Sequence, residues 1–194
     1  FAYVLPNGKA LRGQAGIHKD AMITKLRQAT KEVHKAGGKI CMQIAHAGAQ
    51  AVMKDTKNNP IWGPSPVFNK VFQKMPKAMS QREIADTVRA FGKAAERVKK
   101  AGFDAVEIHG AHGYLVSEFL SPATNKRTDK YGGSLENRTR FLFQIYRAVR
   151  KAVGKAFPVL IKLNCKDFVR GGFKEVEAIG VAKQLEQMGI DAIE

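Results

Sequence analysis

Residues 101–114 read Ala-Gly-Phe-Asp-Ala-Val-Glu-Ile-His-Gly-Ala-His-Gly-Tyr and contain the clearest indication of the fold class. Gly102 is a typical helix-ending residue, and the short apolar run from Asp104 to His109 predicts a strand. A polar stretch rich in glycine follows the strand. A helix, then a short strand, then a polar loop rich in glycine is the order typical of βα units, in which helical crossovers join parallel strands.

The segment before this strand has the clearest helical pattern of the chain. Ser80 and Glu83 have the spacing of a capping box, which predicts a helix beginning after Ser80. One apolar stripe at helical spacing then continues to Gly102. The stripe consists of Ile84, Val88, Phe91, Ala95 and Val98.

The same alternation extends in both directions along the chain. Three more helices are predicted, the first capped by Asp20 and the second by Ser134. They cover residues 20–36, 134–154 and 174–188. Three more short apolar strands are predicted at 39–46, 158–163 and 190–193. Residues 50–79 hold four prolines and no sustained period, which indicates a long loop with room for a small hairpin.

Four βα units with parallel strands fit two α/β architectures. A doubly wound sheet is typically marked by Gly-x-Gly-x-x-Gly after its first strand, and this chain has no such motif. A (β/α)₈ TIM barrel carries its chemistry in the loops after the strands, where the unusual loops of this chain fall. We therefore expect a partial TIM barrel of about four central βα units.

Such a barrel typically takes about 250 residues, and this chain has 194. It begins at Phe1 rather than Met and ends at Glu194 inside a predicted strand. We interpret residues 1–194 as a single fragment of a barrel domain, truncated at both ends. The exposed sheet edges of such a fragment predict a partner, either the remainder of the barrel or a second copy in a homo-oligomer.

Composition excludes several classes of protein. With 44% hydrophobic and 26% charged residues, the chain is neither disordered nor a disulfide-rich miniprotein. The only cysteines, Cys41 and Cys165, form no disulfide or zinc framework, which favours the cytoplasm. No apolar run approaches a membrane span. The net charge of +16 is scattered over the first half, so we expect a solvated basic surface rather than a nucleic-acid partner.

Strand parity places several polar side chains on one face of the sheet. His109 ends its strand on the face opposite to the apolar residues, and His112 and Tyr114 follow in the loop. The same alternation puts Lys162 and Gln43 on that inner face. The amide of Gln43, the two imidazoles and the ammonium of Lys162 would then meet at one end of the barrel, its mouth, where they would suit a flat, anionic cofactor or substrate. Parity alone leaves the ligand unidentified.

Three segments around this mouth also resemble a known family. Residues 101–114, Glu118-Phe-Leu-Ser-Pro122 and Asn125-Lys-Arg-Thr-Asp-Lys-Tyr-Gly-Gly-Ser-Leu-Glu-Asn-Arg138 are similar to the signature of the old yellow enzyme family of FMN-dependent ene-reductases. Weaker matches occur at 43–48, 63–65 and 161–164, in the family's order. Ala49 departs from the pattern, because many relatives have arginine there.

The resemblance implies a role for each matching residue. His109 and His112 match the pair that binds the carbonyl or nitro oxygen of an activated alkene, and Tyr114 matches the proton donor. Gln43 matches the residue that binds the pyrimidine edge of FMN, and Lys162 stands where many relatives have a flavin-binding arginine. The implied reaction passes hydride from NADH or NADPH through FMN to the alkene carbon, and Tyr114 protonates the neighbouring carbon.

Other interpretations stay open on the sequence. A non-catalytic, barrel-derived basic module could bind nucleic acid or an anionic surface, or the mouth could hold a different phosphorylated ligand. No metal is expected, because His109 and His112 lack a third ligand at suitable spacing. His46 has the parity of the buried strand face and is predicted to be structural. Ion pairs within the 125–138 segment are expected among Arg127, Asp129, Glu136 and Arg138.

Overall fold

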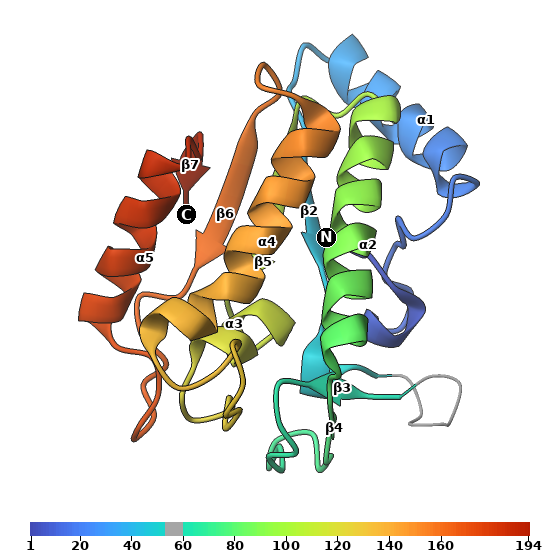
Figure 1. The fold of residues 1–194 in the computed structure, drawn as a ribbon. Coiled ribbons are helices and arrows are strands. Elements are labelled where there is room, and N and C mark those ends of the chain that lie inside the picture. Colours follow the sequence, from blue (N-terminus) through green and yellow to red (C-terminus); the bar gives the residue numbers. More distant parts are fainter. Residues whose placement is uncertain (53–59) are drawn as a thin grey trace.

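A computed structural model describes residues 1–52 and 60–194. Its centre is a five-stranded, wholly parallel sheet in the order β1-β2-β5-β6-β7 (Figure 1). The strands are β1 (Ala2–Tyr3), β2 (Cys41–Ala45), β5 (Ala105–Gly110), β6 (Val159–Leu163) and β7 (Ala192–Ile193). The order follows the chain without reversal, as in a barrel wall, which confirms the predicted α/β fold class.

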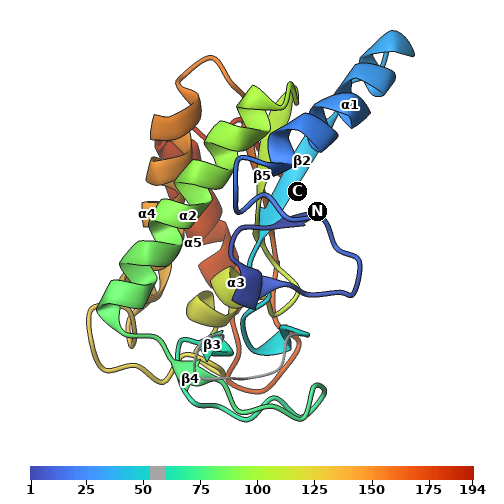
Figure 2. The same ribbon diagram turned by 90° about the vertical axis from the view of Figure 1, so that its right-hand side faces the viewer.

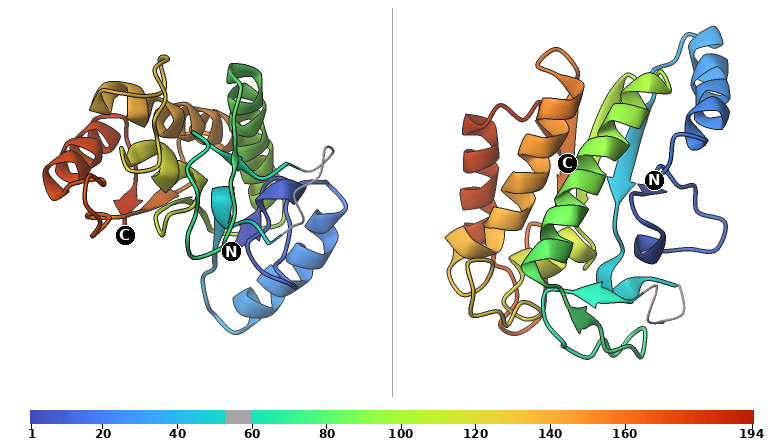
Figure 3. Two further views of the ribbon diagram at one scale, coloured as in Figure 1. Left: turned by 90° about the horizontal axis from the view of Figure 1, so that it is seen from below. Right: turned by 45° about the vertical axis from the view of Figure 1, so that its right-hand side comes forward.

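Helices connect these strands and cover one face of the sheet. They are α1 (Met22–Lys35), α2 (Gln81–Lys100), α3 (Leu115–Leu120), α4 (Leu135–Val153) and α5 (Glu175–Gln187). Figure 2 shows α2, α4 and α5 together on the same side of the strands. In the left panel of Figure 3, seen along the strands, α1, α2, α4 and α5 form an outer arc and the strands lie inside it. The inner face of the sheet is therefore left for polar side chains.

The main core lies between the sheet and the outer helices. Val106, Ile108 and Ile161 point outward from β5 and β6 and are completely buried. Phe91 of α2 and Ile145 of α4 are buried in the same core. Burial of an aliphatic or aromatic side chain of this size contributes about 1.5–3 kcal/mol. The alternation along β5 thus separates a stabilising apolar face from the face that holds Glu107 and His109.

Two of the three predicted helix caps are present. Ser80 Oγ accepts a hydrogen bond from Glu83 N at 3.2 Å, and Glu83 Oε2 accepts one from Ser80 N at 2.7 Å, so the capping box is confirmed. Ser134 accepts from Asn137 N at the start of α4. The predicted cap at Asp20 is wrong. Its carboxylate accepts instead from Arg97 Nε at 2.6 Å, and α1 begins after Ala21.

The first strand and the long loop differ from expectation. β1 is a fifth strand beyond the four predicted, and its two residues are too few to produce an alternating pattern. Within the predicted loop, β3 (Trp62–Gly63) and β4 (Lys77–Ala78) pair in parallel. The small hairpin expected in this loop corresponds to an isolated antiparallel bridge between Asn69 and Lys74. Residues 53–59 of this loop lie outside the described residues.

The ion pairs of the 125–138 segment reach further than predicted. Arg127 and Asp129 pair at 2.6 Å as expected, and Arg127 also donates to the carbonyl oxygens of Pro64 and Met79. Arg138, however, pairs with Glu177 of α5 at 2.5 Å. Glu136 pairs with Arg140 on its own helix. The segment is thus tied to neighbouring elements as well as to itself, a connection that local sequence spacing does not reveal.

Both cysteines are free and exposed. In residues 1–52 and 60–194 we find no helix with the length and apolar character required to cross a lipid bilayer.

Candidate active site

The three residues predicted to be catalytic lie together at the carboxyl end of β5. The ring centroids of His109 and His112 are 5.0 Å apart and nearly perpendicular. The centroids of His109 and Tyr114 are 4.7 Å apart. The ring of Phe1 lies 6.2 Å from both His109 and Tyr114. The strand end therefore carries a compact cluster of two imidazoles and one phenol beside an aromatic wall.

Backbone conformation and two amides fix the loop that holds this cluster. His112 has φ of 60° and Gly113 has φ of 69°, and two consecutive residues in this region turn the chain sharply after β5. His112 N donates to Asn164 Oδ1 at 3.0 Å, which anchors the loop to the end of β6. Gln50 Nε2 lies 2.9 Å from the carbonyl oxygens of both His112 and Gly113. Gln50 and Asn164 are not among the predicted site residues.

His109 is held in one neutral tautomer. It is buried, and burial lowers its pKa to about 4, with further lowering by the nearby His112 and Lys162. The backbone nitrogen of Ala111 donates to His109 Nδ1 at 3.2 Å, so Nδ1 is the acceptor and the proton resides on Nε2. At neutral pH His109 is therefore a neutral imidazole with its Nε2–H free to donate.

Tyr114 is positioned as a protonated phenol. It is the N-terminal cap residue of α3, where its carbonyl oxygen accepts from Glu118 N at 2.8 Å. Its side chain is partly buried, and this burial raises the pKa of the phenol. Because the ordinary pKa of tyrosine is about 10, the hydroxyl keeps its proton at neutral pH. The side chain can therefore act as a proton donor.

Three adjacent strands bring the predicted cofactor-binding residues to the inner face. Gln43 of β2 lies opposite Glu107 of β5, and His109 lies opposite Lys162 of β6. Gln43 Nε2 donates to Glu107 Oε2 at 2.5 Å. Lys162 forms an ion pair with Glu194. The amide and the ammonium thus lie on the same face as the imidazoles, as the strand parity predicted, but both already contact carboxylates that were not among the predicted site residues.

The hydrogen-bonding groups of Gln43 and Lys162 on the inner face of the sheet fit a flavin ring. Gln43 is half-buried and, among the described residues, its carbonyl oxygen has no hydrogen-bond partner. An amide with a free acceptor and a remaining N–H can read the imide edge of a pyrimidine-type ring. Lys162 offers a cation that can stabilise negative charge on that ring. In the described part of the chain, no group of three or more His, Cys, Asp and Glu side chains could hold a metal ion.

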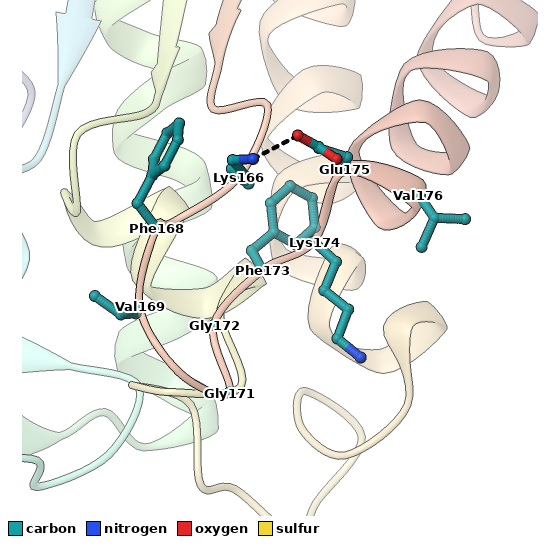
Figure 4. A pocket seen from close by; sticks show the side chains of 9 residues that line it. All are labelled: Lys166, Phe168, Val169, Gly171, Gly172, Phe173, Lys174, Glu175 and Val176. Atoms are coloured by element: carbon teal, nitrogen blue, oxygen red, sulfur yellow. Dashed lines mark hydrogen bonds and ion pairs between the residues drawn. The ribbon is translucent and has the colours of Figure 1, made fainter.

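One cavity borders the cluster, and a second adjoins the first. One of about 470 Å³ is lined by His112, Ser117, Asn164 and Phe168, among others, and so adjoins the candidate catalytic loop. The other, of about 590 Å³, lies along the loop from β6 to α5 (Figure 4). In that loop Lys166 pairs with Glu175 at 2.7 Å, and its ammonium lies 4.8 Å from the centre of the Phe168 ring. Phe168 lines both cavities.

His46 is outside this cluster, in the structural position predicted for it. It is buried, with Nδ1 accepting from Gly48 N at 3.1 Å and Nε2 lying 3.3 Å from Asn7 Oδ1. Its ring stacks on Trp62 at 5.9 Å between centroids. Complete burial lowers the pKa of His46 to about 3, so the side chain stays neutral. These contacts support the turn after β2 and leave His46 no exposed face.

Comparison with known proteins agrees with this geometry. The model of the NADH:flavin oxidoreductase / NADH oxidase family matches residues 1–194. An NADPH dehydrogenase of Bacillus licheniformis is 41% identical over 191 residues, which cover 98% of this chain and 55% of that protein. An NADH oxidase of Thermoanaerobacter brockii is 39% identical over 188 residues, covering 97% of this chain and 29% of that protein.

Solved structures show the same likeness. A 2-naphthoyl-CoA reductase in complex with 2-naphthoyl-CoA superposes with a TM-score of 0.93 at 32% identity, covering 99% of this chain and 31% of that one. Morphinone reductase superposes with a TM-score of 0.87 at 28% identity, covering 99% of this chain and 56% of that one. The chain spans about half the length of the NADPH dehydrogenases that it matches. With its whole length matched by the family model, the chain belongs to the NADH:flavin oxidoreductase / NADH oxidase family.

Proposed function

We propose that residues 1–194 form the central part of a barrel enzyme that uses FMN and NADH or NADPH to reduce the C=C bond of α,β-unsaturated carbonyl or nitro compounds. The observation that carries the proposal is the cluster of His109, His112 and Tyr114 beside the Gln43 and Lys162 face. The relatives named NADPH dehydrogenase and NADH oxidase support a nicotinamide reductant.

Gln43 and Lys162 would hold the cofactor. The amide of Gln43 would bind the pyrimidine edge of the isoalloxazine ring, and the ammonium of Lys162 would stabilise negative charge there. FMN, when bound, supplies hydride transfer from the nicotinamide to the β-carbon of the alkene. For Lys162 to act in this way, its present ion pair with Glu194 must be weakened or shared when the ligand is bound.

His109 and His112 would bind and polarise the substrate oxygen. Because His109 is neutral with its proton on Nε2, it can donate a hydrogen bond to a carbonyl or nitro oxygen at any pH near neutrality. Hydrogen bonding to that oxygen draws electron density from the C=C bond, which makes the β-carbon a better hydride acceptor. The neighbouring Tyr114, a protonated phenol, then gives its proton to the α-carbon.

The remainder of the barrel would complete the site. The chain spans about half of the NADPH dehydrogenases that it matches, and a sheet of five strands that is not closed leaves two edges open. We infer that the chain is one fragment of a longer single domain, located in the cytoplasm and possessing a small-molecule partner. The further strands, or a second copy, would cover the open edges.

The proposal is tested on the full-length protein that contains this chain. It should purify with bound FMN, and NADH or NADPH should be consumed under anaerobic conditions only when an activated alkene such as 2-cyclohexen-1-one is added. The product should be the saturated ketone. Purified protein that binds no FMN when the cofactor is supplied in excess would overturn the proposal, as would FMN-loaded protein that reduces no activated alkene.

A further inference from the structure

Glu107 is a buried acid on the inner face of the sheet to which no catalytic or binding role has been given above. Only 8% of the residue is exposed, and on β5 it lies opposite Gln43 of β2, one inner-face position before the pair of His109 and Lys162. Charged side chains are almost never buried to this degree unless they are paired. Its position two residues before His109, on the same side of β5, brings it into the candidate site.

Glu107 contacts the amide of Gln43 and the carboxyl of Glu194, and the contact with Gln43 crosses from β5 to β2. Gln43 Nε2 donates to Glu107 Oε2 at 2.5 Å, across directly opposed positions of two neighbouring strands. An isolated glutamine amide can turn its oxygen and nitrogen in either direction. The accepting oxygen Oε2 of Glu107 permits only one of these orientations, because it accepts from the amide nitrogen and would repel the amide oxygen.

We propose that Glu107 is a positioning residue that orients the Gln43 amide to recognise the N–H of the flavin pyrimidine ring, an inference that rests on the function proposed above. With its nitrogen held by Glu107, Gln43 presents its carbonyl oxygen as an acceptor and keeps one N–H to donate. That pair is complementary to the adjacent N–H and C=O groups of an imide. Glu107 therefore acts on the cofactor through Gln43.

The pair also explains why a buried carboxyl is tolerated at this place. Burial and the neighbouring carboxyl of Glu194 raise the pKa of Glu107, and together they outweigh the hydrogen bond from Gln43 and the charge of Lys162, which lower it. A carboxyl that served only as structural filling would be replaced by an apolar residue at little cost or even with gain in stability. Replacement of Glu107 should instead allow the Gln43 amide to turn, and the protein would then lose its recognition of the pyrimidine edge of the flavin.

The test compares FMN with its N3-methyl derivative, in which the ring N–H is blocked. Affinities are measured by flavin fluorescence quenching on the full-length apoprotein, for the wild type, Glu107→Leu, Glu107→Gln and the control Glu136→Gln, whose side chain is exposed on α4. We expect wild type and Glu136→Gln to prefer FMN about tenfold over the methyl derivative, which corresponds to about 1.4 kcal/mol. Glu107→Leu should lose most of that preference, and Glu107→Gln should retain an intermediate one.

The outcomes separate this inference from the function on which it rests. If the wild type binds FMN and Glu107→Leu keeps the full preference for FMN over the methyl derivative, Glu107 does not position Gln43. If Glu107→Leu weakens both ligands equally, its role is merely structural and the inference is also overturned. If the wild type binds neither ligand, the proposed function itself fails. A Glu107→Leu protein too unstable to purify is replaced in the test by Glu107→Gln, whose smaller expected loss of preference is then decisive.

Discussion

Glu118 accepts a hydrogen bond from the backbone nitrogen of Ala49 at 2.9 Å, and this contact joins α3 to the turn that follows β2. The side chain is buried, and its second oxygen, Oε2, has no hydrogen-bond partner among the described residues. Burial raises the pKa of Glu118 to about 8, although the bond from Ala49 opposes the shift. The carboxyl is therefore mostly protonated in the folded protein at pH 7.

This burial predicts a dependence of stability on pH. The ordinary pKa of glutamate is about 4.3, so between that value and about 8 the folded state holds a proton that the unfolded state has lost. The contribution of Glu118 is present below pH 4 and is lost as the pH rises through about 8. Glu118→Gln cannot ionise, so its free energy of unfolding should exceed that of the wild type by an amount that grows as the pH rises from about 4 to about 8, by about 5 kcal/mol in all.

Urea unfolding from pH 5 to pH 9 measures this difference. Glu136→Gln is the matched control, because it removes the same kind of charge from an exposed position on α4. Its stability should follow the wild-type pH profile within about 0.5 kcal/mol. A constant difference between Glu118→Gln and the wild type across this pH range would contradict the assignment of a raised pKa to Glu118.

His109 should show no titration near neutral pH. Its pKa is lowered to about 4, mainly by burial and further by the nearby His112 and Lys162, so it becomes charged only in acid. Nuclear magnetic resonance of the imidazole nitrogens should give a neutral ring with the proton on Nε2 from pH 5.5 to pH 8. Comparison with His109→Gln identifies the signal. A midpoint near 6.5, the ordinary value for histidine, would show that the ring is not held as described.

The capping box of α2 should contribute measurably to stability. Ser80→Ala removes the side-chain acceptor for Glu83 N, which leaves a backbone donor without its partner. We expect a loss of about 1 kcal/mol in the free energy of unfolding, measured in urea. Ser80→Asp keeps an acceptor at the same position and should stay within about 0.5 kcal/mol of the wild type. Equal losses in both variants would argue against the cap as the cause.

The parts of the fold that the sequence predicts well depend on local or periodic patterns. The cap at Ser80 needs only Glu83 three residues later, and the inner position of His109 follows from alternation along one strand. Asp20 shows the limit of this reasoning. It has a suitable residue type before a helical pattern, but its partner is Arg97, 77 residues away. Local spacing contains no information on that competing contact.

The candidate site shows the same division. Parity placed Gln43 and His109 on one face without revealing that Gln43 bonds to Glu107, because that contact depends on strand register across 64 residues. Gln50 and Asn164, which anchor the loop at His112, could not be identified for the same reason. Two-residue strands such as β1 are too short for periodicity to detect. Long-range polar contacts are thus what the structure adds.

In the proposed reaction His109 and His112 hold the substrate oxygen while Tyr114 protonates the α-carbon of the alkene. The most direct test of these roles is stopped-flow measurement of the two half-reactions in the FMN-loaded, full-length protein, with Tyr114→Phe compared to the wild type. Flavin reduction by NADPH should be unchanged within about twofold, and reoxidation by 2-cyclohexen-1-one should slow by about 100-fold, because only that step takes a proton from the phenol. Unchanged reoxidation in Tyr114→Phe would contradict the account.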